Sequence, residues 1–374
     1  MAGAVTAVVL AAGYSSRMGE FKPLLPLGEV SVLERVVTLF HDAGISDVRV
    51  VTGHREADLK PRLERLGARA VANPDYRDGM FSSVAAGVAT VGAEVEAFFV
   101  LPVDVPLIRP ETVRRLIDAY LNNRADVVYP RVLGQRGHPP LIAGHHAPEI
   151  AKWQGAGGLR AVLARWDAGA LDVAVADEYI LRDMDTPDDY RLLLERADRS
   201  AIPTEAECMA LLRTVLQVDE RIVHHGQAVA RVAVLLGDAL NRAGCSLDIP
   251  LLAAAGLLHD LARQEPDHAR AGAHILRQWG FDPVAGLVAS HMDLVVNERK
   301  PVHAREVLYL ADKLVRGERV VSLAERFRPM LERHTHEPSV IRSIAGRLRT
   351  ARTVRKRLEN VLGFPLEKLI TLHE

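Results

Sequence analysis

Two basic residues lie in a loop of small residues that follows the first apolar segment of the chain. The loop reads LAAGYSSRMGEFK from Leu10 to Lys22, and its small side chains let backbone N–H groups form a concavity for an anion. Arg17 offers a planar fork that matches phosphate oxygens, and Lys22 offers a movable point charge. Attack on the α-phosphate of a nucleoside triphosphate requires charge neutralisation of this kind. The loop therefore predicts a nucleotidyl-transfer site; the alternative is an ordinary loop between a strand and a helix.

Neither of the two common glycine-rich phosphate loops fits this segment. A Walker A loop needs Gly-Lys followed by Ser or Thr, whereas Gly19 is followed here by Glu20, Phe21 and Lys22. A dinucleotide-binding loop needs the pattern G-x-G-x-x-G, which this loop does not contain.

Two aspartates are expected to complete the site. Asp104 follows the apolar segment at residues 97–102, and ligands of open parallel sheets bind where the strands end. A carboxylate in that position suits a Mg²⁺ ion that bridges nucleotide phosphates. Asp185, within RDMDTPDD, is predicted to follow another strand and to be a second magnesium ligand, with a helix N-cap as its alternative role.

Histidines and aspartates that suit a metal ion lie in the second half of the chain. His259 and Asp260 follow the apolar segment at residues 249–258, and Asp312 follows another at residues 307–311. Polar groups beside buried segments are costly if they are unpaired, so we expect them to face one metal. Imidazole-rich ligation favours a transition metal such as Mn²⁺ or Fe²⁺ over Mg²⁺. The alternative is a set of separate surface or helix-capping residues.

Short apolar segments alternate with amphipathic stretches up to about residue 198. This alternation predicts a mostly parallel sheet with helices on both faces. A capping box at Ser31 and Glu34 and first-turn prolines at Pro110 and Pro187 predict helix starts, and Gly44 predicts a helix end. The predicted strands are residues 5–10, 48–52, 69–72, 97–102, 127–129, 173–176 and 179–181.

The pattern beyond about residue 205 has helical periodicity throughout, and no strand is expected there. A chain of 374 residues also exceeds what one hydrophobic core usually supports. We therefore predict an α/β domain at residues 1–198, with a Rossmann-like, mostly parallel sheet, followed by an all-α domain at residues 205–374.

The composition is that of an ordinary globular protein, with 48% hydrophobic and 25% charged residues. The formal net charge of -1 provides no overall positive field that would recruit nucleic acid. Cys208 and Cys245 are too few for a disulfide framework. No apolar run reaches the roughly 18 residues that span a bilayer. We expect a cytoplasmic protein that binds neither nucleic acid nor membranes.

The first half resembles the MobA-like molybdenum cofactor nucleotidyltransferases, in particular their cytidylyltransferase branch. The resemblance covers about residues 4–196 and rests on the motifs LAAGYSSRMGEFKPLLPLG, NPDYRDGM, PVDVPLI, RGHPPLI and DMDTPDDY. Guanylyl-transferring relatives typically read LAGG, whereas this chain has Ala12 at the second of those positions, which favours CTP. One departure is Ala156, where the family often has an aspartate.

This resemblance implies attack by the terminal phosphate of molybdopterin on the α-phosphate of CTP, with release of pyrophosphate. The nucleophile is already an anion, so no general base is required. Arg17, Lys22 and Asp104 are the implied catalytic residues, and Asp104 and Asp185 would hold Mg²⁺. The implied nucleotide-binding residues are Leu10, Ala11, Ala12, Gly13, Arg17, Lys22, Asn73, Ser82 and Ser83.

The second half resembles the HD superfamily of metal-dependent phosphohydrolases over about residues 210–330. The order of His225, His259-Asp260 and Asp312 carries the resemblance. His225 is preferred to His224 because a valine follows it four residues later. The resemblance implies hydrolysis of a phosphoester with one or two divalent metals, and Asp260 would bridge a pair. The implied ligands are His225, His259, Asp260, His268, His291 and Asp312.

Together the two resemblances imply a bifunctional enzyme with CTP and a molybdopterin-type cofactor as substrates. Molybdoenzyme apoproteins that receive the cofactor are the expected further partners. The alternatives are a sugar or alcohol phosphate as acceptor, GTP as donor, and a helical half that is a metal-stabilised regulatory module without turnover. His145 and His146 show no motif spacing and are interpreted as structural or exposed, and residues 342–357 as a solvated basic helix face.

Overall fold

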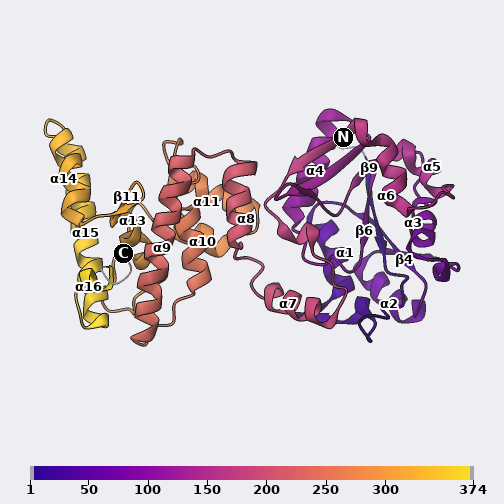
Figure 1. The fold of residues 1–374 in the computed structure, drawn as a ribbon, viewed down its shortest axis with the longest axis horizontal. Coiled ribbons are helices and arrows are strands. Elements are labelled where there is room, and N and C mark those ends of the chain that lie inside the picture. Colours follow the sequence, from indigo (N-terminus) through magenta and orange to yellow (C-terminus); the bar gives the residue numbers. More distant parts are fainter. Residues whose placement is uncertain (1–3, 371–374) are drawn as a thin grey trace. The chain divides into compact units, whose positions relative to one another are not determined.

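The chain folds into two units, Met1–Ser200 and Ala201–Glu374, in a computed structural model that describes residues 4–370. The first unit contains a mixed sheet flanked by helices, and the second is helical apart from one short hairpin. Figure 1 shows both units coloured along the chain. This arrangement confirms the predicted fold class.

The elements of the first unit alternate along the chain as the hydrophobic pattern predicts. Its strands are β1 (Ala4–Leu10), β2 (Pro26–Leu27), β3 (Val30–Ser31), β4 (Asp47–Thr52), β5 (Arg69–Ala72), β6 (Val95–Pro102), β7 (Val127–Val132), β8 (Gln135–Arg136), β9 (Leu141–Ala143) and β10 (Ala170–Ala174). Its α-helices are α1 (Val32–Asp42), α2 (Glu56–Leu66), α3 (Met80–Val88), α4 (Pro110–Asn123), α5 (Ala147–Ala151), α6 (Gly158–Leu163) and α7 (Pro187–Ala197). Its 3₁₀ helices are η1 (Lys22–Leu24), η2 (Tyr76–Asp78), η3 (Gly144–His146), η4 (Ala164–Gly169) and η5 (Glu178–Leu181).

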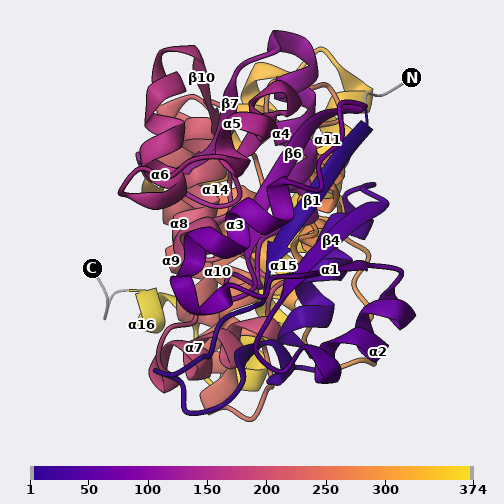
Figure 2. The ribbon, with the colours of Figure 1, turned by 90° about the vertical axis from the view of Figure 1, so that its right-hand side faces the viewer.

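The main sheet has the strand order β10-β7-β9-β6-β1-β4-β5, with β8 attached to β7. β1 pairs in parallel with both β4 and β6, which lie side by side with it in Figure 2. Helices α3, α5 and α6 lie on one side of these strands, and α1 and α4 lie on the other (Figure 1). Because both faces are covered, Val8, Phe98 and Phe99 are fully buried. The carboxyl ends of β1, β4, β5 and β6 therefore meet at one edge of the sheet.

Local signals in the sequence set most element boundaries correctly. The capping box of Ser31 and Glu34 opens α1, and Gly44 follows its end with φ +92°. Pro110 and Pro187 stand in the first turns of α4 and α7. The predicted strand at residues 179–181 is wrong, because this segment forms η5. The Asp177 side chain accepts a hydrogen bond from the Tyr179 N–H and starts a helical turn there.

Asp185 does not follow a strand, contrary to the prediction. It lies in the loop between η5 and α7, and the N-cap of α7 is Thr186, whose hydroxyl accepts from the Asp189 N–H. The strand β9 was not predicted, because three residues are too short for an alternating pattern. β9 is antiparallel to both of its neighbours, so it inserts one reversed strand into a parallel sheet.

The second unit consists mainly of helices packed around α9 and α10. One detail differs from the prediction, because residues 315–320 form a two-stranded hairpin. Within residues 4–370, no helix has both the length and the apolar character required to cross a bilayer. Its elements are α8 (Glu205–Met209), the π-helix η6 (Ala210–Val215), α9 (Glu220–Arg242), α10 (Ile249–Leu258), α11 (His268–Gln278), α12 (Asp282–Val288), α13 (Ala304–Lys313), β11 (Val315–Arg316), β12 (Arg319–Val320), α14 (Leu323–Arg333), α15 (Pro338–Leu362) and α16 (Leu366–Ile370).

Two glycines let α9 and α10 approach each other closely. A Cβ atom on Gly226 of α9 would lie 2.5 Å from the Leu257 carbonyl oxygen of α10. A Cβ atom on Gly256 of α10 would lie 2.5 Å from the Ala230 Cα atom of α9. Backbone atoms cannot yield easily, so a side chain at either position would separate the helices. This contact fixes the positions of two histidines. His225 directly precedes Gly226, and His259 follows Gly256 by about one helical turn.

We predict that Gly256→Ala destabilises the second unit by about 1–3 kcal/mol, because the added methyl group overpacks the contact between α9 and α10. Differential scanning calorimetry of the full chain measures this as a lower melting temperature. Gly272→Ala in α11 is the matched control. Its Cβ would have no neighbour closer than 3.5 Å, so the gain in helix propensity should leave stability unchanged or raised by up to about 1 kcal/mol. Equal melting temperatures for the two variants would contradict the close contact.

Candidate active site and metal centre

The loop after β1 turns back on itself beside the carboxyl edge of the sheet. Ser15 and Gly19 adopt left-handed backbone conformations, with φ of 58° and 72°. The Ser15 hydroxyl accepts a hydrogen bond from the Lys22 N–H at 3.0 Å. This bond ties the two ends of the loop together, so the Lys22 side chain is directed back toward the sheet edge.

Lys22 lies between two carboxylates. Its Nζ atom is 3.1 Å from Asp104 Oδ2 and 3.0 Å from Asp185 Oδ1. Arg17 Nη1 lies 2.6 Å from the other oxygen of Asp185. The hydrogen bond from Lys22 lowers the pKa of Asp185, with smaller contributions from the charge of Arg17. The structure thus brings all four charged residues of the predicted site into one chain of contacts.

A cavity of about 300 Å³ opens beside this cluster. Its walls include Leu10, Ala11, Ala12 and Gly13 on one side and Asp104 on another. A Cβ atom on Gly13 would meet nothing within 4 Å, so the space over this residue is open to a ligand. The position at the carboxyl ends of parallel strands is where α/β sheets bind nucleotides.

Asn73, Ser82 and Ser83 form a hydrogen-bonded group at the same edge. The Asn73 amide nitrogen donates to the hydroxyls of Ser82 at 2.9 Å and Ser83 at 3.0 Å. Asn73 directly follows β5, and Ser83 lines the cavity itself. These three predicted nucleotide-binding residues therefore lie together, although only Ser83 among them lines the cavity.

Further cavity residues were not among the predicted ligands. Tyr14 and Tyr76 line it with their ring centroids 5.3 Å apart, and Arg77 and Met80 lie beside them. Aromatic rings in the wall of a cavity suit stacking against a nucleobase. The motif that contains Tyr76 was recognised in the sequence, but nothing in its pattern showed that this ring would lie against Tyr14.

The six predicted ligands of the second unit converge on one buried point. Asp260 Oδ1 lies 3.4 Å from Nε2 of both His268 and His291. Asp312 Oδ1 lies 3.4 Å from His225 Nε2 and 3.8 Å from His259 Nε2. Two overlapping groups arise, one of His225, His259 and Asp260 and one of Asp260, His268 and His291. Asp260 belongs to both, which is the arrangement expected of a bridging ligand.

Backbone carbonyls orient three of these imidazoles. The Nδ1 atoms of His225, His259 and His291 lie 2.7–2.9 Å from the carbonyl oxygens of Gly317, Gly256 and Val288. A carbonyl oxygen accepts from an N–H group, so Nδ1 of each ring carries a proton, and Nε2 carries a lone pair wherever the ring is neutral. The Nε2 atoms of His259, His268 and His291 are buried without a hydrogen-bond partner. Unpaired buried acceptors of this kind fit a metal ion, and burial lowers the pKa of His259 to about 4, which keeps that ring neutral.

Three basic residues neutralise the two buried aspartates of this centre. Lys313 contacts Asp312 directly, Arg263 Nη1 lies 2.7 Å from Asp260 Oδ2, and Arg326 Nη2 lies 3.9 Å from Asp312 Oδ1. Burial alone would raise the pKa of Asp312, but the charge of Lys313 and the hydrogen bond from His225 lower it well below the usual range. These basic residues were missed in the sequence, since ordinary lysines and arginines carry no distinguishing spacing.

His224 lies outside the cluster, in contrast to its neighbour. It is half-buried and faces Glu220 and Glu318 at 3.7 and 3.4 Å. The choice of His225 over His224 agrees with this geometry.

The fold and these two sites define a nucleotidyltransferase domain joined to a histidine–aspartate metal domain. Residues 7–170 match the family described as "MobA-like NTP transferase domain", and residues 222–317 match the family described as "HD domain". An HD domain implies a divalent metal ion, and the ligand cluster fits one.

Relatives of known name match the first half of the chain. The molybdenum cofactor cytidylyltransferase of Escherichia coli is 29% identical over 194 residues, which are 52% of this chain and 97% of that protein. Nicotine blue oxidoreductase of Paenarthrobacter nicotinovorans is 33% identical over 200 residues, or 50% and 96% of the two chains. A probable molybdenum cofactor guanylyltransferase of Bacillus mycoides is 28% identical over 142 residues, or 37% and 66%. The chain belongs to the family of MobA-like NTP transferases and carries an HD domain in addition.

We predict that His225→Gln weakens metal binding by the second unit at least about tenfold, because it removes an imidazole ligand. Metal content after dialysis against buffered Mn²⁺, measured by inductively coupled plasma mass spectrometry, reports the change. His224→Gln is the matched control and should retain the metal of the wild type. Loss of metal in the control, or its retention in His225→Gln, would refute the assigned ligand set.

Proposed function

We propose that residues 1–198 form a molybdenum cofactor cytidylyltransferase, which transfers a cytidylyl group from CTP to the terminal phosphate of molybdopterin with release of pyrophosphate. The observation that carries this proposal is the position of Lys22 between Asp104 and Asp185, with Arg17 attached, at the mouth of the cavity. Both signs of charge are needed there. The cations suit the triphosphate, and the carboxylates suit the cation that accompanies it.

Asp104 and Asp185 are the residues that would hold Mg²⁺ in this unit. Their hard oxygen donors fit this ion, and both already face one position where a positive charge lies. When bound, Mg²⁺ would neutralise charge that develops on the phosphates during transfer. The chain itself would position the substrate: Arg17 and Lys22 would bind phosphate oxygens, and the loop from Leu10 to Gly13 would orient the nucleotide against them.

The proposed choice of CTP over GTP rests on Ala12, which stands where guanylyl-transferring relatives typically have a glycine. A Cβ atom on Gly53 would lie 3.0 Å from the Ala12 methyl group and 2.7 Å from the Tyr76 ring. The Ala12 methyl group and the Tyr76 ring therefore both pack against Gly53. Tyr76 also lies against Tyr14 in the wall of the cavity. A residue of different size at position 12 would therefore shift the Tyr76 ring and, through it, the base of a bound nucleotide.

We predict that Asp104→Asn lowers pyrophosphate release from CTP in the presence of molybdopterin and Mg²⁺ by about 100-fold or more, because a charge that stabilises the transition state is lost. Asp188→Asn, whose side chain is 82% exposed at the start of α7, is the control and should keep full activity. A thermal-shift comparison of CTP with GTP gives the donor independently. Activity with a sugar phosphate but not with molybdopterin would replace the acceptor, and activity with neither would remove the assignment.

We further propose that residues 205–374 form an HD phosphohydrolase whose substrate carries more than one phosphate group. Its metals, one or two ions such as Mn²⁺ or Fe²⁺, would activate water for attack on the phosphoester when bound to the six ligands. The same unit has a cavity of about 480 Å³ on the hairpin β11–β12 and α14. Arg316, Arg319 and Arg328 line it, and Glu325 is the acidic residue among them.

The arginine-lined cavity is connected to the metal centre by the hairpin itself. Gly317, in the turn of the hairpin, supplies the carbonyl that orients His225. Arg326, on the same helix α14 as Arg328, lies 3.9 Å from Asp312. Guanidinium groups bind phosphate oxygens in a bidentate manner, so a second phosphate of the substrate would find its partners there.

We predict that Arg328→Ala raises the KM for a nucleoside triphosphate about tenfold and leaves the KM for a simple phosphomonoester unchanged, since a charge-assisted hydrogen bond to the distal phosphate is lost. Steady-state phosphate release with Mn²⁺ measures both values. Arg333→Ala, an exposed arginine near the end of the same helix, is the control. If the wild type hydrolyses no phosphoester after Mn²⁺ or Fe²⁺ loading, the unit is a regulatory module instead.

The expected setting of the whole protein is the cytoplasm, where molybdopterin-type cofactors and CTP are available and the two cysteines stay reduced. Molybdoenzyme apoproteins that take up the finished cofactor would be its protein partners.

A further inference from the structure

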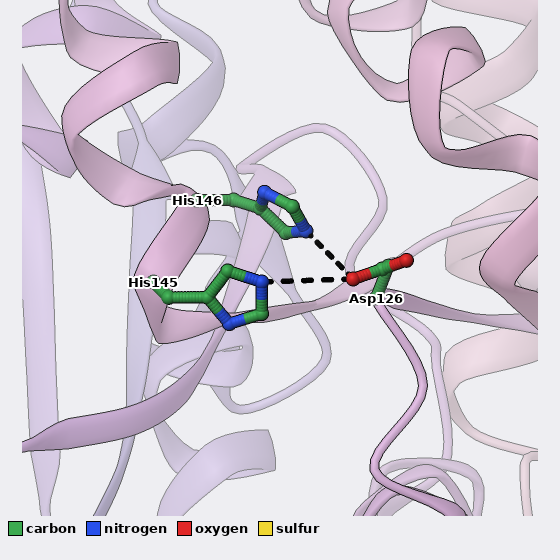
Figure 3. Close-up of side chains that lie close together, drawn as sticks. All are labelled: Asp126, His145 and His146. Atoms are coloured by element: carbon green, nitrogen blue, oxygen red, sulfur yellow. Dashed lines mark hydrogen bonds and ion pairs between the residues drawn. The ribbon is translucent and has the colours of Figure 1, made fainter.

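A third group of polar side chains converges in the first unit and shares no residue with either site described above. Asp126 precedes β7, and His145 and His146 lie in η3. Figure 3 shows both imidazoles pointing at the carboxylate of Asp126. Nε2 of His146 lies 2.9 Å from Asp126 Oδ1, and Nε2 of His145 lies 3.6 Å from the same oxygen (Figure 3). One carboxylate oxygen therefore faces two ring nitrogens.

The backbone around this group is fixed on several sides. The Asp126 N–H donates to the Gly169 carbonyl at 3.2 Å, and the Asp126 carbonyl accepts from the Ala143 N–H at 2.9 Å. A Cβ atom on Gly144 would overlap the Val95 carbonyl oxygen, so η3 begins against β6 at a residue that must lack a side chain. Segments from three parts of the chain thus hold the three side chains in place.

The two histidines differ in their exposure to solvent and in their ring contacts. His146 is 10% exposed and stacks on Trp166, with ring centroids 3.6 Å apart. His145 is 68% exposed and lies 4.0 Å from His146, centroid to centroid. Both Nε2 atoms face the same carboxylate oxygen, so a bound cation would use their lone pairs together with the carboxylate.

We propose that Asp126, His145 and His146 form a binding site for a divalent transition-metal ion such as Zn²⁺. Two imidazoles and one carboxylate are a donor set that suits Zn²⁺, Ni²⁺ and Cu²⁺ rather than Mg²⁺. The three donor atoms lie within 4.8 Å of one another, and the exposure of His145 leaves room for water to complete the coordination.

This site is separate from the nucleotidyl-transfer site. Because β9 runs antiparallel to β6, the residues after β9 lie at the edge where β6 begins, whereas Asp104 follows the end of β6. The eight residues of β6 place the two edges roughly 20–25 Å apart at about 3.3 Å per residue. The ion would join the start of β7 to η3, and it would not take part in the chemistry at Asp104.

Metal content of the full-length protein tests the proposal. Chelator-treated protein is dialysed against buffered Zn²⁺, and the bound metal is counted per chain in the wild type, His145→Gln and His41→Gln. His145→Gln should lose one Zn²⁺ ion per chain and keep the metal of the HD centre. His41, an exposed histidine of α1, is the matched control and should change nothing. Equal zinc content in all three proteins would overturn the proposal.

The stacked tryptophan gives a second readout that is local to this site. Ni²⁺ bound to His146 should quench the fluorescence of Trp166 in the wild type. The quenching should be lost in His145→Gln and in Asp126→Asn, while Trp166→Phe should lose the signal but keep the zinc stoichiometry. Quenching of wild-type strength in His145→Gln would count against the site. The native fluorescence of each variant before titration reports its folding, so a poorly folded variant can be recognised and set aside.

Discussion

The carboxylates of Asp104 and Asp185 repel each other unless a positive charge lies between them, and the ammonium group of Lys22 supplies that charge. The turns of the loop after β1 at Ser15 and Gly19, and the hydrogen bond from the Lys22 N–H to Ser15, bring Lys22 to this point. A magnesium–triphosphate complex brings both a cation for the carboxylates and anions for Lys22 and Arg17. Substrate binding would therefore exchange partners among charges already present and would leave none of them unpaired.

In the second unit, two aspartate carboxylates likewise require compensating charge, and they are more deeply buried. Asp260 and Asp312 are almost inaccessible to solvent, so their charges require compensation from nearby groups. Arg263 and Lys313 provide part of it, and a divalent metal ion held by the same aspartates and the neighbouring imidazoles would provide the rest. The close contact of α9 and α10 at Gly226 and Gly256 sets the positions of those imidazoles. Helix packing and metal chemistry are thus linked in this unit.

Much of the architecture could be predicted from local patterns, because strands buried on both faces and capped helices leave strong signals. The segment at residues 179–181 could not, since the Asp177 side chain overrides the β-propensity of Tyr179 and Ile180. The charged motifs around Asp104 and His259 were visible for a similar reason: they interrupt apolar runs. Lys313 and Tyr14 were not, because their roles depend on which residues the tertiary fold places beside them.

Membership of the MobA-like family does not by itself determine the reaction. One relative of similar identity is named an oxidoreductase and another a cytidylyltransferase, so the shared fold accommodates different chemistry. The distinction must lie in side chains at the carboxyl edge of the sheet. In this chain that edge carries two carboxylates around a lysine, an arginine at the rim and paired tyrosines over a cavity. Each of these groups would have a partner on the proposed magnesium-bound nucleoside triphosphate, which supports nucleotidyl transfer rather than electron transfer.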